Sequence, residues 1–221
     1  MDQPAFLAFI QDSHAPNPNP DERPGRWVSE QEWPSQKIHL RRFGLTDGKL
    51  TDQMLDNGGP TTICSKLSLG LATGEYMPIA GTAELPHDQR CDDAHAVCFD
   101  TPPLEDSVEM LGTPLVHLTV SSDCSQGLIA ARICDVAPDG SSTLISYGIL
   151  NLKLRNGREV LAPVVPGENM NVSVRLNDIG WRITAGHRLR LALSSQLWPM
   201  AWPMGEEAEL TLDLASCRLE V

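Results

Sequence analysis

Long apolar runs and export signals are both missing from this sequence of 221 residues. No segment approaches the roughly 18 consecutive apolar residues that a membrane-spanning helix needs. The N-terminal stretch MDQPAFLAFIQDSHAPNPNPDERPG has neither the basic start nor the small-residue cleavage site of a secretory signal peptide. These absences predict a cytoplasmic protein with no membrane partner.

Positive charge is also scarce. The chain has 17 Lys and Arg residues against 29 Asp and Glu residues, which gives a formal net charge of −12. Such a charge repels phosphate backbones, so nucleic-acid binding would need a local basic patch. The only dense one is KIHLRRF, Lys37 to Phe43, whose charges fit the solvent-facing side of a strand equally well. We therefore predict no nucleic-acid partner.

Paired-cysteine motifs are absent although the chain has six cysteines. Without a C-x-x-C pair, a zinc site would need several distant residues to converge. Without an export signal a disulfide framework is not expected, and buried free thiols are favoured. His87 and His95 flank the acidic segment DQRCDD, where a His/Asp metal site is conceivable, but a plain surface loop is favoured. We predict no metal and no cofactor.

The pattern that is present is apolar alternation with a period of two, as in Val116, Leu118 and Val120. The same alternation recurs in NVSVRLN, in HRLRLALSS and near the C-terminus. It is typical of antiparallel strands with one buried face. APDGSS reads as a hairpin turn, and the apolar phase slips by one residue after Ile149, which predicts a β-bulge or bend close to Gly148.

About ten such strands, without helix-strand alternation, predict an all-β sandwich over residues 51–221. The best helical pattern, Thr51 to Asn57, is too short for more than one turn or loop helix. Residues 1–50 differ: the strand AFLAFI is apolar on both faces, and a proline-rich segment follows it. A strand apolar on both faces belongs inside a sheet. We therefore expect a chain that is part of something larger.

Catalytic motifs are weak. A serine hydrolase usually raises its nucleophile on a G-x-S-x-G turn, and the nearest match, GSSTL, lacks the second glycine and lies in the expected hairpin turn. His117 is expected on the solvent face of a strand, His187 beside a turn, and His14 in the proline-rich loop without a visible partner.

Four carboxylates lie close together in the sequence around DTPPLEDSVE: Asp100, Glu105, Asp106 and Glu109. Paired carboxylates could serve glycosidase chemistry. Neighbouring carboxylates are common on solvated loops, so the solvated loop is favoured and no catalytic residue is predicted.

The segment LWPMAWP is the strongest candidate for a functional surface. It places Trp198, Pro199, Met200, Trp202 and Pro203 in an irregular apolar loop that we expect to be exposed and to have no core to fill. Such a patch usually marks a contact surface. We predict a domain interface there.

Three ordered blocks, DDAHAVCFDTPPLEDSVEMLGTPLVHLTVSSD, ARICDVAPDGSSTLISYGILNLKLR and AGHRLRLALSSQLWPMAWP, resemble the C-terminal domain of the X-Pro dipeptidyl-peptidase and cocaine-esterase group of serine hydrolases. The resemblance covers roughly residues 85–221, and GRWVSEQEWP, Gly25 to Pro34, resembles the segment that joins that domain to the hydrolase domain. It implies a jelly-roll (galactose-binding-like) β-sandwich without the Ser-Asp-His triad.

The resemblance also implies a partner, the α/β-hydrolase catalytic domain, on which this chain would pack to help shape the substrate pocket or an oligomer. Residues 1–50 would then be a strand without its neighbours and a linker left from that domain, in a chain cut at both ends. A homo-oligomer is one expected arrangement. The alternative is a stand-alone carbohydrate- or protein-binding β-sandwich module.

Overall fold

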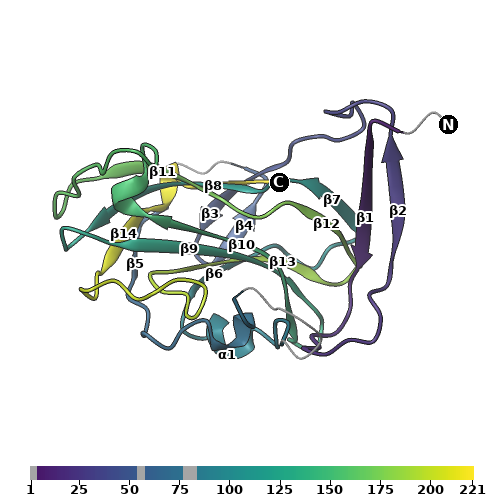
Figure 1. The fold of residues 1–221 in the computed structure, drawn as a ribbon, viewed down its shortest axis with the longest axis horizontal. Helices are drawn as coiled ribbons and strands as arrows, with labels where there is room; N and C mark the ends of the chain where they lie inside the picture. The colour runs from purple at the N-terminus through teal and green to yellow at the C-terminus, as the bar shows by residue number, and fades with distance from the viewer. Residues whose placement is uncertain (1–3, 54–57, 77–83) are drawn as a thin grey trace.

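The computed structural model describes residues 4–53, 58–76 and 84–221 of the chain. These residues form a jelly-roll β-sandwich (Figure 1). The all-β prediction is confirmed. The described residues contain fifteen strands, and eleven of them lie after residue 51, close to the ten or so predicted for residues 51–221. None of the described helices is long and apolar enough to cross a membrane.

The smaller sheet has the strand order β2-β1-β12-β7, with β1 Phe6–Asp12, β2 Gly25–Glu30, β7 Val108–Gly112 and β12 Ile179–Ile183. The larger sheet has the order β10-β9-β13-β6-β4-β3-β15-β8-β14-β5, and β11 pairs with β8. Its strands are β3 Arg42–Thr46, β4 Lys49–Thr51, β5 Pro60–Ile63, β6 Val97–Asp100, β8 Leu115–Ser122, β9 Leu128–Val136, β10 Ser142–Asn151, β11 Met170–Arg175, β13 Arg188–Ser194, β14 Leu210–Asp213 and β15 Arg218–Glu220. The helical turns are α1 Arg90–Asp93 and the 3₁₀ segments Leu71–Thr73, Leu152–Leu154 and Leu214–Ser216.

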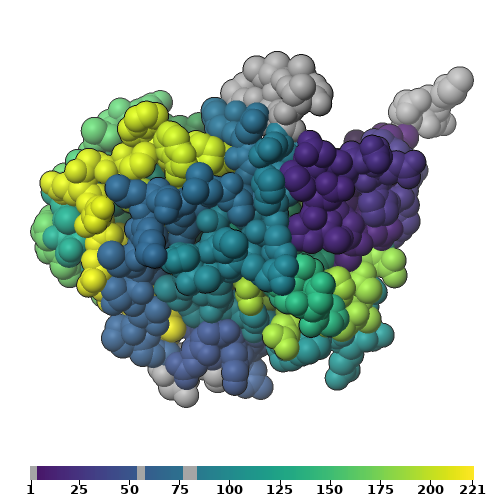
Figure 2. Space-filling model, turned by 90° about the horizontal axis from the view of Figure 1, so that it is seen from below, coloured from purple at the N-terminus to yellow at the C-terminus, as the bar shows by residue number. Residues whose placement is uncertain are grey.

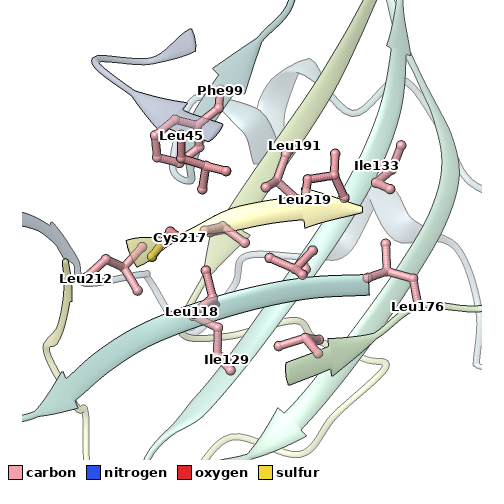
Figure 3. Packing of buried hydrophobic residues seen from close by; sticks show 14 of the residues in the cluster. Leu45, Phe99, Leu118, Ile129, Ile133, Leu176, Leu191, Leu212, Cys217 and Leu219 are labelled. Atoms are coloured by element: carbon pink, nitrogen blue, oxygen red, sulfur yellow. The ribbon is translucent and has the colours of Figure 1, made fainter. Parts of the chain in front are cut away.

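The main core is built from strands of the larger sheet and also includes Met110, Trp181 and Ile183 of the smaller sheet. Val116, Leu118 and Val120 of β8 all point inward, as the alternation predicted. Figure 3 shows Leu118 and Leu219 gathered with side chains from β9 and β13 in the space between these strands. The alternating segments therefore supply both walls of the core.

The β9–β10 hairpin is confirmed, since Gly140 N donates to Ala137 O at 2.9 Å in the turn. The predicted bulge is present but lies at Ile145, where the register shifts between Leu144 and Ser146, rather than at Gly148. Gly148 serves a different purpose: a Cβ there would lie 2.2 Å from the carbonyl oxygen of Arg175. The glycine thus allows β10 to approach the end of β11.

The expectation that the first strand would lack sheet neighbours is wrong. β1 pairs antiparallel with β2 and parallel with β12, and these strands stand at one end of the molecule (Figure 1). Ile10 on one face of β1 is 2% exposed, whereas Leu7 on the opposite face is 56% exposed. β3 and β4, within or bordering residues 1–50, belong to the larger sheet. That residues 1–50 derive from an upstream domain stays a prediction.

The helical turn expected at Thr51 to Asn57 falls mainly outside the described residues. Thr51 ends β4, and residues 54–57 are not described.

Candidate interaction surface at the tryptophan loop

The tryptophan loop, Leu197–Pro203, follows β13 and lies beside residues 65–71. Ser65 N donates to Ser195 Oγ at 3.0 Å, and Ser195 N donates to Ser65 Oγ at 3.1 Å. Trp198 N then donates to Leu69 O at 2.8 Å. In Figure 2 yellow-green atoms of this part of the chain lie beside blue atoms of the earlier segment. The loop is therefore fixed to a second segment that is distant in sequence.

Asp92 holds that second segment in place. Its buried carboxylate accepts from the backbone N–H groups of Gly70 and Ala72, each at 2.9 Å. Gly70 has a φ of +112°, and a Cβ there would lie 2.2 Å from the carbonyl oxygen of Trp198. Only glycine permits this contact between the two segments.

The surface so formed is apolar. Trp202 is 80% exposed, Leu71 64% and Leu67 45%. The rings of Trp198 and Trp202 meet edge-on, with centroids 5.3 Å apart and planes at 75°. A shallow hollow of about 450 Å³ is lined by Leu67, Ser68, Leu71, Trp198, Trp202 and Pro203. This set is called the tryptophan surface below.

The expectation that the loop has no core to fill is wrong for its inner side. Leu197 is buried with Leu69, Leu128 and Ala130, and Met200 packs against that cluster. Pro199 is half-buried. The loop thus has a packed underside and an exposed outer side, and only the outer side is available for contact. Leu67 and Leu71 were missed because SKLSLGL alternates like a strand, although the structure has turns there.

The sequence-predicted histidines do not converge. His14, expected to lack a partner, contacts Arg23 through Nε2, and its Nδ1 lies 3.0 Å from Asp12 O. His87 lies 3.0 Å from Glu84, and His95 lies 3.2 Å from Lys66. Over the described ranges no group of three or more His, Cys, Asp or Glu side chains could hold a metal ion.

The four carboxylates of DTPPLEDSVE are divided between two strands and the segment that joins them. Asp100 accepts two hydrogen bonds from Arg190, both at 2.7 Å, on the larger sheet. Glu109 accepts two from Arg26, also at 2.7 Å, on the smaller sheet. Glu105 and Asp106 are exposed. Asp100 and Glu109 are thus each engaged by an arginine on a different sheet and do not form a catalytic pair.

The cysteines are free, as predicted, but they are not all buried. Cys134 and Cys217 are buried, whereas Cys64 and Cys91 are exposed. Burial, with Asp93 nearby, raises the pKa of the Cys98 thiol to about 12, so this thiol stays protonated and is a poor nucleophile near neutral pH.

Two serine-histidine-carboxylate groupings were missed by the sequence reasoning. In the first, Asp135 Oδ1 lies 2.7 Å from His187 Nδ1, and Asp135 Oδ2 accepts from Trp181 Nε1 at 3.0 Å and from Ser13 Oγ. The serine contacts the carboxylate rather than the imidazole, so the ring cannot deprotonate it. This cluster fastens the end of β1 to β9 and β12.

The second grouping is Ser173, His117 and Glu220, with Ser173 Oγ 3.0 Å from His117 Nδ1 and His117 Nε2 3.4 Å from Glu220 Oε2. Ser173 lies in the middle of β11, not on the strained strand-to-helix turn that raises a nucleophile from a sheet. Glu220 also accepts hydrogen bonds from Arg42 and Arg218. The geometry is that of a cross-strand polar cluster.

A buried ionic network was also missed. Asp93 Oδ2 accepts from Arg190 and from Ser142 Oγ at 3.0 and 2.8 Å. Its Oδ1 lies 3.0 Å from Arg132 Nη2, an ion pair whose angles fall outside hydrogen-bond geometry. Because Ser142 is engaged here, the GSSTL segment offers no free nucleophile at that position. The signal for this network was an arginine inside the otherwise apolar run LIAARIC.

Nearly the whole chain matches a known protein family. The family model described as X-Pro dipeptidyl-peptidase C-terminal non-catalytic domain matches residues 1–219. The cocaine esterase of Rhodococcus sp. (strain MB1 Bresler) is 30% identical over 189 residues, which is 78% of this chain and 32% of that protein. This chain therefore spans about a third of the length of that curated relative.

Solved structures support the same fold. An aminopeptidase from a marine sediment Thaumarchaeota archaeon and an alpha-amino acid ester hydrolase each superpose with a TM-score of 0.74 at 20% identity. In both cases the match covers 88% of this chain and 38% of the other. The matched blocks, the sandwich and the coverage agree: this chain belongs to the X-Pro dipeptidyl-peptidase C-terminal non-catalytic domain family.

Proposed function

We propose that this chain serves a cytoplasmic serine hydrolase of the X-Pro dipeptidyl-peptidase or acyl-esterase type, and that the tryptophan surface packs on the catalytic region. The observation that carries the proposal is an exposed apolar surface held by a rigid frame. Asp92 and Gly70 fix its backbone, while Trp202 and Leu71 remain exposed. A surface of this kind is costly in water and suits a permanent contact.

The tryptophan surface is better suited to binding a protein than to binding a sugar. Carbohydrate-binding modules stack a sugar ring on a flat aromatic face. Here Trp198 and Trp202 meet edge-on at 75°, so the two rings do not form one platform. The flanking residues Leu67 and Leu71 add aliphatic area instead of hydrogen-bonding groups. A tryptophan that becomes buried among aliphatic neighbours when the partner binds is typical of interface hot spots.

The test is Trp202→Ser in the full-length hydrolase that carries this domain. We expect the free energy of docking between the two domains to fall by about 2 kcal/mol, the size typical of an interface hot spot. The loss should appear as a separate melting transition of this domain at lower temperature, or as a raised KM. The matched control is Trp27→Ser, because Trp27 is also exposed and its strand β2 lies at the other end of the molecule (Figure 1).

Unchanged melting and kinetics for Trp202→Ser would contradict the proposal. A loss with Trp27→Ser alone would move the interface to the β1–β2 end. Sedimentation of the isolated chain provides a third result: a dimer dissociated by Trp202→Ser would assign the surface to a homo-oligomer. Specific glycan binding abolished by the same change would favour the carbohydrate-binding alternative.

A further inference from the structure

A second hollow lies between the smaller sheet and β3, at the end of the molecule that carries β1 and β2. Its volume is about 620 Å³, within the range of sites for small organic ligands. The apolar part of its wall comprises Ile10, Val28, Ile38, Phe43, Leu104, Val108, Met110, Leu111, Ile183, Leu189 and Val221. This hollow is called the inter-sheet groove. It shares no lining residue with the tryptophan surface.

The basic segment KIHLRRF, which the proposed function does not use, forms part of its rim. Lys37, His39 and Arg41 all line the groove. The expectation that these charges sit on the wet face of a strand is wrong for them, because β3 begins only at Arg42. A chain with a net charge of −12 therefore places its densest basic stretch at the mouth of its apolar groove.

The carboxylates on the rim are already neutralised. Glu30 pairs with Lys37 at 3.0 Å and accepts from Ser35 Oγ at 2.9 Å. Glu109 forms its two-bond pair with Arg26. The charged side chains that line the groove are three cations, Arg26, Lys37 and Arg41, and two anions, Glu30 and Glu109. His39 also lines it. Arg41 in turn pairs with Asp52 at 3.0 Å, so each of the three cations has a carboxylate partner, and His39 is the remaining basic side chain of the lining.

Arg41 is the cation best placed to hold an anion. Its backbone N–H and C=O both bond to Val221, at 2.8 and 2.9 Å, and its guanidinium lies 4.9 Å from the centre of the Phe43 ring. Asp52 accepts from Nε and Nη2, and no acceptor for Nη1 occurs among the described residues. The group is fixed in position and still has donors to offer.

We propose that the inter-sheet groove binds an amphipathic monocarboxylate, with its apolar chain against Ile10, Met110 and Ile183 and its carboxylate at Arg41. The apolar wall accounts for the tail, and the Nη1 donors of Arg41, which Asp52 does not engage, account for the head group. Guanidinium and carboxylate form charge-assisted hydrogen bonds that are stronger than neutral ones. This site is independent of docking at the tryptophan surface.

Titration calorimetry of the 221-residue chain with decanoate tests the proposal. Decanoate should bind with 1:1 stoichiometry, and decyltrimethylammonium, which has an equally long chain but the opposite charge, should bind at least about tenfold more weakly. Arg41→Gln should weaken decanoate about tenfold. The matched control, Arg158→Gln, removes an exposed arginine that does not line the groove and should leave the affinity unchanged.

Filling the groove tests the position of the chain. Val28→Phe enlarges a half-buried side chain on the wall and should abolish decanoate binding. If Val28→Phe does not fold, Leu111→Phe enlarges another lining side chain, on β7 at the other edge of the smaller sheet. Equal affinity for the two charged probes, or unchanged affinity in the filled variant, would overturn the proposal. The proposal would also be overturned if the chain formed a dimer that does not bind decanoate and that Val28→Phe dissociates. The occupant of the groove would then be a second copy of the chain.

Discussion

At the residue scale, Asp93 joins two arginines that reach it from different strands. Arg132 comes from β9 and is fully buried, and Arg190 comes from β13. A buried guanidinium is tolerated only while its counter-charge is present. The network therefore fixes how β9 and β13 lie relative to α1. Removing one of its charges should strongly destabilise the fold.

Asp93→Asn should be strongly destabilising. The change keeps the shape of the side chain but leaves Arg132 buried without its counter-charge, which costs about 3–5 kcal/mol. Urea unfolding followed by tryptophan fluorescence measures the loss. Asp106→Asn, at an exposed position, should change stability by no more than about 0.5 kcal/mol. Similar midpoints for both variants would show that Asp93 is not needed as a charge.

Glu220 predicts a pH dependence. Burial alone would raise the pKa of Glu220, but hydrogen bonds from Arg42 and Arg218, together with His117, lower it from its usual 4.5 to about 2. The folded state therefore prefers the ionised carboxylate. The stability it contributes is present above about pH 4.5 and is lost as the pH falls toward 2.

Thermal melts across that window provide the measurement. Wild type should lose stability between pH 4.5 and 2, and Glu220→Gln should lose less over the same range while being less stable at pH 7. Parallel curves for the two proteins would show that other carboxylates dominate the acid transition.

At the element scale, the tryptophan loop depends on one backbone contact. Gly70→Ala places a methyl group against Trp198 O, in addition to the cost of a positive φ. We expect a loss of at least about 1–3 kcal/mol, the cost of a strained backbone position, and a changed environment of the Trp198 and Trp202 rings. Near-ultraviolet circular dichroism reports on those rings.

Gly140→Ala is the matched control for that substitution. Gly140 also has a positive φ, +84°, but a Cβ there would have no neighbour within 4 Å. It should lose about 1 kcal/mol, the smaller conformational cost alone, and keep the aromatic spectrum of wild type. Equal effects of the two substitutions would mean that the contact with Trp198 does not hold the loop.

Strands with clear alternation could be predicted, and strand partners could not. The alternation in β8, β11 and β13 reflects one buried face, which is a local property of the sequence. The pairing of β1 with β12 joins residues about 170 positions apart, and nothing in AFLAFI encodes it. For the same reason the sequence identified the tryptophan loop but not Leu71, which reaches that surface through a turn and the distant Asp92.

At the scale of the whole molecule, the described residues offer polar clusters but no nucleophile served by a base in a cleft. We expect the isolated chain to hydrolyse neither p-nitrophenyl acetate nor Gly-Pro-p-nitroanilide, and no serine to react with a fluorophosphonate probe. Mass spectrometry after labelling is the measurement. Stoichiometric label on Ser173, lost in Ser173→Ala and in His117→Ala, would instead make the Ser173, His117 and Glu220 cluster reactive.

The position of β15 has a consequence for synthesis of the protein. β15 pairs with β3 on one side and β8 on the other, so it is the strand that joins the two halves of the larger sheet. It is also the last of the described strands in chain order. A nascent chain can therefore form its local hairpins early, but its sandwich cannot close until residues 218–220 have left the ribosome. Until then the edges of β3 and β8 are unpaired and open to chaperones or to another chain.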